Sequence, residues 1–229
     1  KFNFSGGDLT SDAGLLLLKE FEQQIGFSSV VSRNFGTKEN KNFREHSDAS
    51  LLAQKVYQII TGYFTDSIAD EISHDPMFKA LLNKGRLALQ PTLSRFFNRL
   101  NKDSLQQLLK VQTKLQHTIY SIKNPDSILI DVDSTSFETF GKQENTAYNA
   151  HYHNTGYHPL LAYDGLTGDL LKAELRKGSC YTSKNAVEFL TPLLDDFQHK
   201  LPKTKLFLRG DSGFAIPKLY KLLETNSTS

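Results

Sequence analysis

The sequence contains one cysteine, Cys180, one methionine and no tryptophan. A single cysteine excludes an internal disulfide, so the composition is the one expected of a protein in a reducing compartment such as the cytoplasm. The sequence also lacks any apolar run near the roughly 18 residues that a membrane helix needs. We expect no signal peptide either. We therefore expect a protein that does not associate with membranes.

The sequence has little excess charge of either sign, with 27 basic and 25 acidic residues and a net charge of +2. Bulk electrostatics therefore does not indicate nucleic acid, and any DNA binding would depend on where individual Lys and Arg residues lie. The 38% of hydrophobic and 11% of aromatic residues are typical of a globular protein with one large or two small domains. Because the chain begins without Met and ends in a polar tail, we expect it to be a piece of a longer protein.

The segment SILIDVDST, residues 127–135, carries the most informative pattern in the sequence. Its apolar run predicts a strand buried on both faces, and Asp131 and Asp133, two residues apart, would share one face of it. A second apolar run, KLFLRGD, ends in Asp211. Two buried strands that bring carboxylates to one edge of a sheet can hold a hard cation such as Mg²⁺. The alternative is that Asp133 and Asp211 only begin turns.

The remaining patterns divide the chain near Asn124-Pro125. Before this point, capping residues followed by apolar stripes predict amphipathic helices. After it, an Asp-Gly turn predicts an antiparallel hairpin, and the polar segment 137–154 is predicted to be a loop or lid. The predicted strands are 127–132, 158–163, 170–175 and 205–210, and the predicted helices between and after them are 183–201 and 216–224.

A predicted helix over residues 91–102 has an apolar side and a basic side. Short helices with a short break before it resemble a helix-turn-helix unit. In that interpretation, phosphates and base edges would be contacted by Thr92, Ser94, Arg95 and Arg99. An ordinary amphipathic helix with a solvated basic face explains the same pattern equally well.

The order of strand, hairpin, helix, strand and helix, with acids at the first and fourth strand ends, resembles the RNase H-like core of DDE transposases. The segments LIDVDST, HPLLAYDGLTGDLL, LRKGSCYTSKNAVEFL and LFLRGDSGFA are similar to bacterial insertion-sequence transposases of the cut-and-paste type. So are the earlier segments FSGGDLTSDAGLLLL, KVYQIITGYFTDSIADEISHDPMFKALL and QPTLSRFFNRL. The resemblance covers nearly the whole chain.

The resemblance implies an α/β fold that is α+β overall. A helical N-terminal DNA-binding region, residues 1–123, would precede an RNase H-like mixed-sheet catalytic core, residues 124–229, that is incomplete at its C-terminus. The first catalytic acid would be Asp133, or else Asp131, and the second would be Asp211. The family's third acid, a Glu on a later helix, has no match, so this chain alone would be inactive.

The resemblance also implies the chemistry and the partners. Two Mg²⁺ or Mn²⁺ ions, bound by Asp133 and Asp211, would promote DNA strand cleavage and strand transfer without a covalent enzyme intermediate. The partners would be terminal inverted repeats and target DNA, with a homodimer in the transposition complex and a location at the bacterial nucleoid in the cytoplasm. Arg209, Arg176 and Lys177 lie near predicted strand ends, where they would contact phosphates or remain solvated.

Two other functions fit parts of the pattern. The run Asp131-Val132-Asp133-Ser134-Thr135 also looks like the first motif of haloacid-dehalogenase-type phosphatases, with Asp131 as nucleophile, Asp133 as acid/base and Asp211 as a Mg²⁺ ligand. A hairpin after the first strand and a helical N-terminal region argue against that family. The last alternative is a transposase-derived DNA-binding remnant without catalytic activity.

Overall fold

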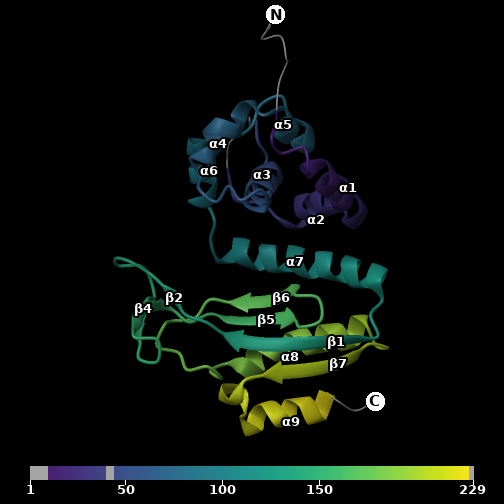
Figure 1. Ribbon diagram of the computed structural model, residues 1–229, viewed down its shortest axis with the longest axis vertical. Coiled ribbons are helices and arrows are strands. Elements are labelled where there is room, and N and C mark those ends of the chain that lie inside the picture. The colour runs from purple at the N-terminus through teal and green to yellow at the C-terminus, as the bar shows by residue number, and fades with distance from the viewer. Residues whose placement is uncertain (1–9, 40–43, 227–229) are drawn as a thin grey trace, which may run out of the picture. The chain divides into compact units, whose positions relative to one another are not determined.

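The structure is a computed structural model that describes residues 10–39 and 44–226 of the chain (Figure 1). The chain forms two compact units, residues 1–119 and 120–229. The long helix α7, Lys102–Lys123, begins in the first unit and ends in the second. Within the described ranges, no helix combines the length and the apolar character that crossing a membrane requires.

The first unit is helical within the residues described. Two clusters of buried side chains hold it together, one around Leu93 and Phe96 and the other around Tyr57 and Phe78. Its elements before α7 are α1 Leu15–Ile25, α2 Phe27–Asn34, α3 Asp48–Ile60, α4 Ile68–Glu71, the 3₁₀ helix η1 Ile72–His74, α5 Pro76–Leu82 and α6 Gln90–Phe97.

Two helices of this unit begin at the caps that the sequence predicts. The hydroxyl of Ser47 accepts a hydrogen bond from the backbone N–H of Ser50 at 3.2 Å at the start of α3. The carboxylate of Asp75 accepts bonds from the backbone N–H groups of Met77 and Phe78 at the start of α5. Such caps satisfy donors that the helix leaves unpaired, and each typically contributes about 1 kcal/mol.

The second unit is built on a four-stranded mixed sheet with the strand order β6-β5-β1-β7. β1 pairs antiparallel with β5 and parallel with β7, and β5 pairs antiparallel with β6. The predicted hairpin and the predicted parallel pairing of the first and fourth core strands are therefore confirmed. The bounds are β1 Ser127–Ser134, β5 Leu160–Asp164, β6 Leu170–Glu174, α8 Ala186–Lys200, β7 Lys205–Gly210, the 3₁₀ helix η2 Ser212–Phe214 and α9 Pro217–Asn226.

One face of this sheet carries the core of the second unit. Ile128, Ile130 and Val132 of β1 are buried in a cluster to which both α8 and α9 contribute side chains. Figure 1 shows α8 running behind the strands of this sheet. The alternate positions Leu129, Asp131 and Asp133 are half-buried or exposed. The prediction that β1 is buried on both faces is therefore wrong. The side chains of α8 and α9 pack into one core, which covers the face of β1 that carries Ile128, Ile130 and Val132.

The segment predicted as a loop or lid, residues 137–154, instead forms most of a second sheet of three short strands. These are β2 Phe137–Glu138, β3 Ala147–Asn149 and β4 Asn154–Tyr157, in the order β2-β4-β3. The strands are too short and too polar to give an alternating pattern. Close packing secures them, since a Cβ on Gly156 would lie 2.0 Å from the carbonyl oxygen of Phe137.

Candidate functional site

Two carboxylates follow neighbouring strands at one edge of the main sheet. The parallel register of β1 and β7 pairs Asp131 with Arg209 and ends one residue later, so Asp133 and Asp211 are the next residues on each side. The backbone at Asp211 is still extended, with φ −71° and ψ 177°. Because side chains alternate along a strand, this register directs Asp133 and Asp211 to the face that carries Asp131 and Arg209.

Asp131 is engaged by the guanidinium of Arg209. The Nε and Nη2 atoms of Arg209 donate to the two carboxylate oxygens of Asp131. Hydrogen bonding from Arg209 is the main reason that the pKa of the Asp131 carboxyl lies below its usual range. Gly165 lies directly against this carboxylate, since a Cβ there would lie 2.7 Å from Oδ2 of Asp131. A side chain at position 165 would collide with the Asp131 carboxylate, so the Asp131–Arg209 pair depends on the glycine there.

Asp133 and Asp211 are exposed, and within the described residues they accept hydrogen bonds only from the backbone that follows them. Asp133 accepts a hydrogen bond from the N–H of Ser134 at 2.7 Å, and Asp211 accepts one from the N–H of Gly213 at 2.9 Å. Neither forms an ion pair with any residue in the described ranges. Each carboxylate is thus oriented through one oxygen and keeps the other oxygen available for a ligand.

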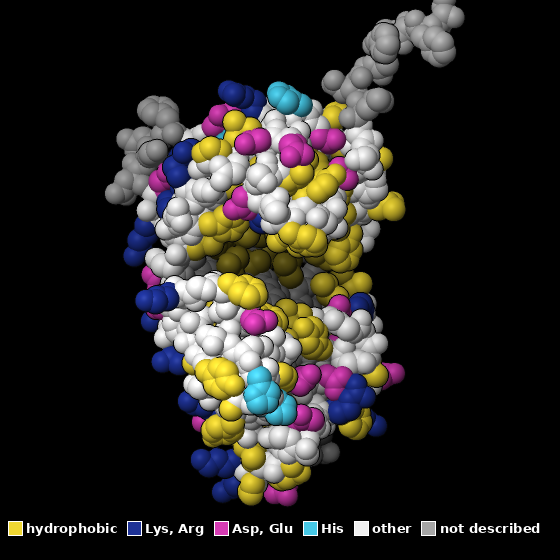
Figure 2. Space-filling view, turned by 60° about the vertical axis from the view of Figure 1, so that its left-hand side comes forward, with side chains coloured by type: hydrophobic (Ala, Val, Ile, Leu, Met, Phe, Trp, Pro, Cys, Tyr) yellow, Lys and Arg dark blue, Asp and Glu magenta, His cyan; other side chains and the backbone are white. Residues whose placement is uncertain are grey.

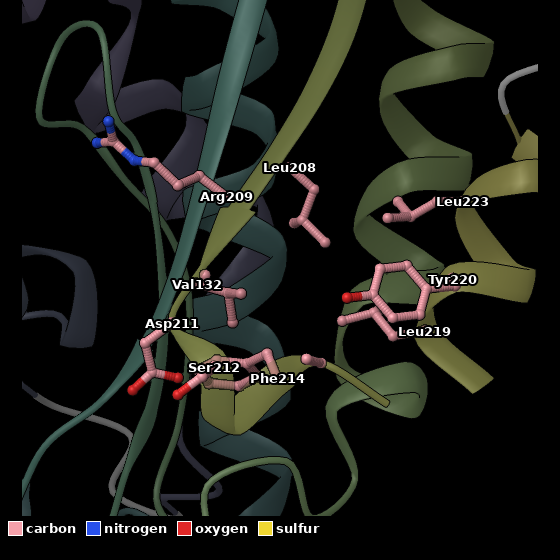
Figure 3. Close-up of a pocket in the computed structure, with 11 residues that line it drawn as sticks. Val132, Leu208, Arg209, Asp211, Ser212, Phe214, Leu219, Tyr220 and Leu223 are labelled. Carbon is pink, nitrogen blue, oxygen red and sulfur yellow. The ribbon is translucent and has the colours of Figure 1, made fainter. Parts of the chain in front are cut away.

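A pocket of about 420 Å³ lies beside Asp211. Its walls come from β1, β7, η2 and α9 and are mainly apolar, with Leu208, Leu219 and Leu223 among them. Figure 3 shows the carboxylate of Asp211 and the side chain of Arg209 directed away from these leucines. The edge of the sheet therefore has a polar side with the acids and an apolar side next to α9.

The loop before α8 supports this edge through Thr182. The hydroxyl of Ser134 lies 3.5 Å from that of Thr182, and a Cβ on Gly213 would lie 2.9 Å from the Thr182 methyl group. Arg176 fixes the loop by donating to the backbone oxygens of Thr182 and Lys184. Arg176 is buried, so neither the predicted phosphate contact nor a solvated position applies to it. Sequence reasoning missed Thr182 because such a residue has no distinguishing pattern around it.

The four residues predicted to bind DNA in the first unit do not share one face of a helix. Helix α6 ends at Phe97, so the predicted extension to residue 102 is wrong, and Arg99 lies in the turn before α7. Arg99 donates to Asp48 and to the hydroxyl of Thr37, each at 3.1 Å. Its side chain is only 22% exposed. The prediction that Arg99 is on an exposed helix face is therefore wrong, because an acid distant in sequence binds it.

The other three residues lie on α6. Arg95 is exposed and donates to the hydroxyl of Thr92 at 3.1 Å, and the hydroxyl of Ser94 accepts a bond from Gln90. Residues 83–89 separate α5 from α6, which is longer than the three or four residues of a helix-turn-helix turn. The DNA-binding role of this unit stays a prediction.

The donor set at the sheet edge suits a hard cation but is small. Asp133 and Asp211 offer carboxylate oxygens, the ligands that Mg²⁺ and Mn²⁺ prefer. Within residues 10–39 and 44–226, no three His, Cys, Asp or Glu side chains are grouped closely enough to hold a metal ion. A further ligand from outside this part of the chain, such as a phosphate of a substrate, would be needed to complete the coordination.

Comparison of the chain with solved structures finds similarity to transposase complexes. Among solved structures, it is similar to the Mos1 transposase paired-end complex with left transposon end, at 15% identity, 83% coverage of this chain, 59% of that chain and a TM-score of 0.30. It is also similar to the Mos1 mariner paired end complex with Mn, at 13% identity, 95% and 71% coverage and a TM-score of 0.29. At these TM-scores the likeness supports no conclusion about the site.

The chain thus spans 59% of the length of the first of these proteins. No curated protein matches it significantly. The family model described as transposase DDE domain group 1 matches residues 1–229. Because that match extends over the entire chain, the chain belongs to the transposase DDE domain family, group 1.

Proposed function

We propose that this chain acts in DNA transposition and that Asp133 and Asp211 bind the two Mg²⁺ or Mn²⁺ ions used for strand cleavage and strand transfer. The observation that supports the proposal is the pair of exposed carboxylates at the ends of two adjacent parallel strands, neither with a cationic partner among the described residues. Membership of the DDE family implies a divalent metal and a nuclease or transferase activity, and these two residues match the acids that the motifs indicate.

The residues around the two acids have separate tasks in this proposal. The N–H groups of Ser134 and Gly213 each hold one carboxylate oxygen and so direct the other toward the ligand. Arg209 neutralises Asp131, which limits the negative charge that the two free acids must tolerate. A divalent ion bound there would supply Lewis-acid polarisation of a phosphodiester.

The proposed partners are the terminal inverted repeats of a mobile element and the target DNA. A homodimer would hold the two ends together, since each end needs its own pair of acids. A haloacid-dehalogenase-type phosphatase is disfavoured because its nucleophile would be Asp131, whose two oxygens are both engaged by Arg209. A catalytically inactive remnant stays an alternative, since the described residues show two acids and not three.

Titration with Mn²⁺, followed by the electron paramagnetic resonance signal of free Mn²⁺, tests the site. We expect Asp211→Asn to weaken Mn²⁺ binding at least about tenfold, because a neutral amide is a poor ligand for a hard cation. Asp195→Asn, an exposed Asp on α8 outside the site, is the matched control and should change nothing. Equal Mn²⁺ affinity in the chain and in Asp211→Asn would refute the proposed site.

A plasmid-nicking assay with supercoiled DNA distinguishes an active nuclease from a catalytically inactive remnant. We expect this chain by itself to bind Mn²⁺ without nicking DNA, because the described residues provide only two of the acids. Nicking that Asp211→Asn abolishes and Asp195→Asn preserves would support the site and contradict the expected inactivity. Nicking that persists in Asp211→Asn would assign the cleavage to other residues.

A further inference from the structure

A polar pocket of about 240 Å³ lies in the first unit, between α6 and the segment that precedes α3. Four arginines line it, Arg44, Arg86, Arg95 and Arg99, together with the hydroxyl-bearing Thr92. The residues come from segments about fifty positions apart in the sequence, so no local pattern indicates the pocket. Four guanidinium groups around so small a space are the kind of lining that binds an anion.

Two of the four arginines are already neutralised. Arg44 and Arg99 both bind Asp48 and Glu39, at 3.0 to 3.3 Å. Asp48 also accepts hydrogen bonds from the N–H and the hydroxyl of Thr37. Two cations and two anions thus form a closed network that builds one wall of the pocket and leaves no net charge there.

The other two arginines are less engaged. Arg86 approaches Glu45 only to 3.9 Å, and their side chains are 79% and 57% exposed, so this ion pair is weak. Arg95 has no acidic partner among the described residues and donates to Thr92. Counting the pocket's arginines against Glu39, Glu45 and Asp48 leaves Arg95 as the uncompensated positive charge.

The backbone beneath Arg95 is firmly held. The side-chain amide of Gln54 exchanges two hydrogen bonds with the backbone of Ala88, at 2.7 and 2.9 Å. The carboxylate of Asp70 accepts the N–H of Gln90 at the first residue of α6 at 2.9 Å. Arg95 and Thr92 are therefore presented by a helix whose backbone is held in place, so binding a ligand has to order their side chains but not the backbone.

We infer that this pocket binds one phosphate group of the DNA backbone, through Arg95, Arg86 and Thr92. A phosphate group accepts the fork of a guanidinium and the hydroxyl of a Thr together, and a pocket of about 240 Å³ has room for it. In Figure 2, Lys and Arg side chains lie mainly along the left-hand margin of the face shown, with Asp and Glu side chains among them and across its middle. The inference rests on the proposed function for its DNA partner.

In this arrangement Arg99 and Arg44 are positioning residues that hold one wall of the pocket, and the carboxylate of Glu45 competes with the phosphate for Arg86. The carboxylate of Glu45 lies beside the pocket and near Arg86, where it repels a phosphate and partly neutralises the arginine. Removing its charge should strengthen phosphate binding, an outcome that a misfolded variant cannot imitate. The pocket therefore predicts one variant that loses affinity and another that gains it.

The test measures the affinity of the whole chain for a mixed-sequence DNA duplex at several salt concentrations. When one phosphate contact is lost, the negative slope of log affinity against log salt becomes shallower by about 0.9. The factor by which affinity falls between about 50 and 200 mM salt is then roughly 3.5 times smaller. We expect this change in Arg95→Ala and a partial one in Arg95→Lys. We expect Glu45→Gln to bind more tightly by a few-fold.

Arg33→Ala is the matched control, because Arg33 is an exposed arginine of the same unit outside the pocket. An unchanged slope in Arg95→Ala, or weaker binding by Glu45→Gln, would overturn the inference. Inorganic phosphate as a competitor separates this inference from the proposed function. If the chain binds no duplex but Arg95→Ala and Glu45→Gln change its phosphate affinity in opposite directions, the phosphate site stands and the DNA function fails.

Discussion

Asp131 on β1 and Arg209 on β7 are register partners in a parallel pair of strands, and the guanidinium of Arg209 engages both oxygens of the Asp131 carboxylate. The two residues are 78 positions apart in the sequence. Their pairing leaves Asp133 and Asp211, each two residues further along the chain, as the acids at this edge without a cationic partner in the described part of the chain. This single contact decides which of the three carboxylates has a cationic partner.

Arg209→Ala should raise the pKa of Asp131 toward its ordinary value, because the bond from Arg209 is the main cause of its lowering. It should also tighten Mn²⁺ binding roughly two- to threefold, since a nearby positive charge disappears from a solvent-exposed site. Carboxyl chemical shifts during an acid titration and the Mn²⁺ titration measure the two effects. Arg209→Lys keeps the charge and should preserve most of the Mn²⁺ affinity of the unaltered chain. Weaker Mn²⁺ binding in Arg209→Ala would show that Arg209 supports the metal site instead of opposing it.

Asp133→Asn and Asp131→Asn should differ in their effect on metal binding. The first removes an anionic ligand, and we expect at least about a tenfold loss of Mn²⁺ affinity. The second removes a carboxylate that already has a partner, so we expect little loss. The same Mn²⁺ titration with both variants measures this difference. A larger loss in Asp131→Asn would transfer the role of first acid to Asp131, and a phosphorylated Asp131 would favour the phosphatase.

Gly178→Ala should destabilise the second unit, because its Cβ would lie 2.2 Å from the backbone oxygen of Ala147 and 2.6 Å from that of Gly156. Gly178 also donates its N–H to Gly156, so the backbone cannot move away without losing that bond. We expect the free energy of unfolding to fall by about 2–3 kcal/mol. Gly85→Ala is the control, since no atom lies within 4 Å of its Cβ position. Urea unfolding followed by circular dichroism measures both variants, and equal stabilities would contradict the close packing.

Asp48 should make the stability of the first unit depend on pH. Burial alone would raise its pKa, but hydrogen bonds from Thr37 and Arg99 outweigh burial and lower the pKa below the ordinary 3.8. A group with a lowered pKa stabilises the fold above its unfolded pKa and loses that contribution as pH falls through the folded pKa. The contribution of Asp48 is therefore complete above about pH 4 to 5 and declines below it.

Asp48→Asn should remove this contribution, at a cost of about 2 kcal/mol near neutral pH, where hydrogen bonds to a charged group are lost. The stability difference between the chain and Asp48→Asn should shrink as the pH falls below 4. Urea unfolding at pH 3, 5 and 7 measures it. A difference that stays constant over this range would show that Asp48 contributes through packing and not through its charge.

The sequence by itself determined the elements whose signals are local. The apolar runs at 127–132 and 205–210 predict β1 and β7, the Asp-Gly turn predicts the β5–β6 hairpin, and Asp75-Pro76 predicts the start of α5. These succeed because strand alternation, turn chemistry and helix capping depend on residues within a few positions of one another. The position of Asp133 and Asp211 after two strands could also be predicted from the local sequence, and so could the transposase motifs.

The tertiary structure alone decided how the polar side chains pair. Arg99 looked like an exposed DNA contact, but Asp48, 51 positions away, holds it in the first unit. Arg176 is buried against backbone carbonyl oxygens, and Asp131 differs from Asp133 only because Arg209 arrives beside it. A charged side chain takes whichever partner the fold brings within about 3 to 4 Å, and sequence spacing does not encode that distance for residues on different elements.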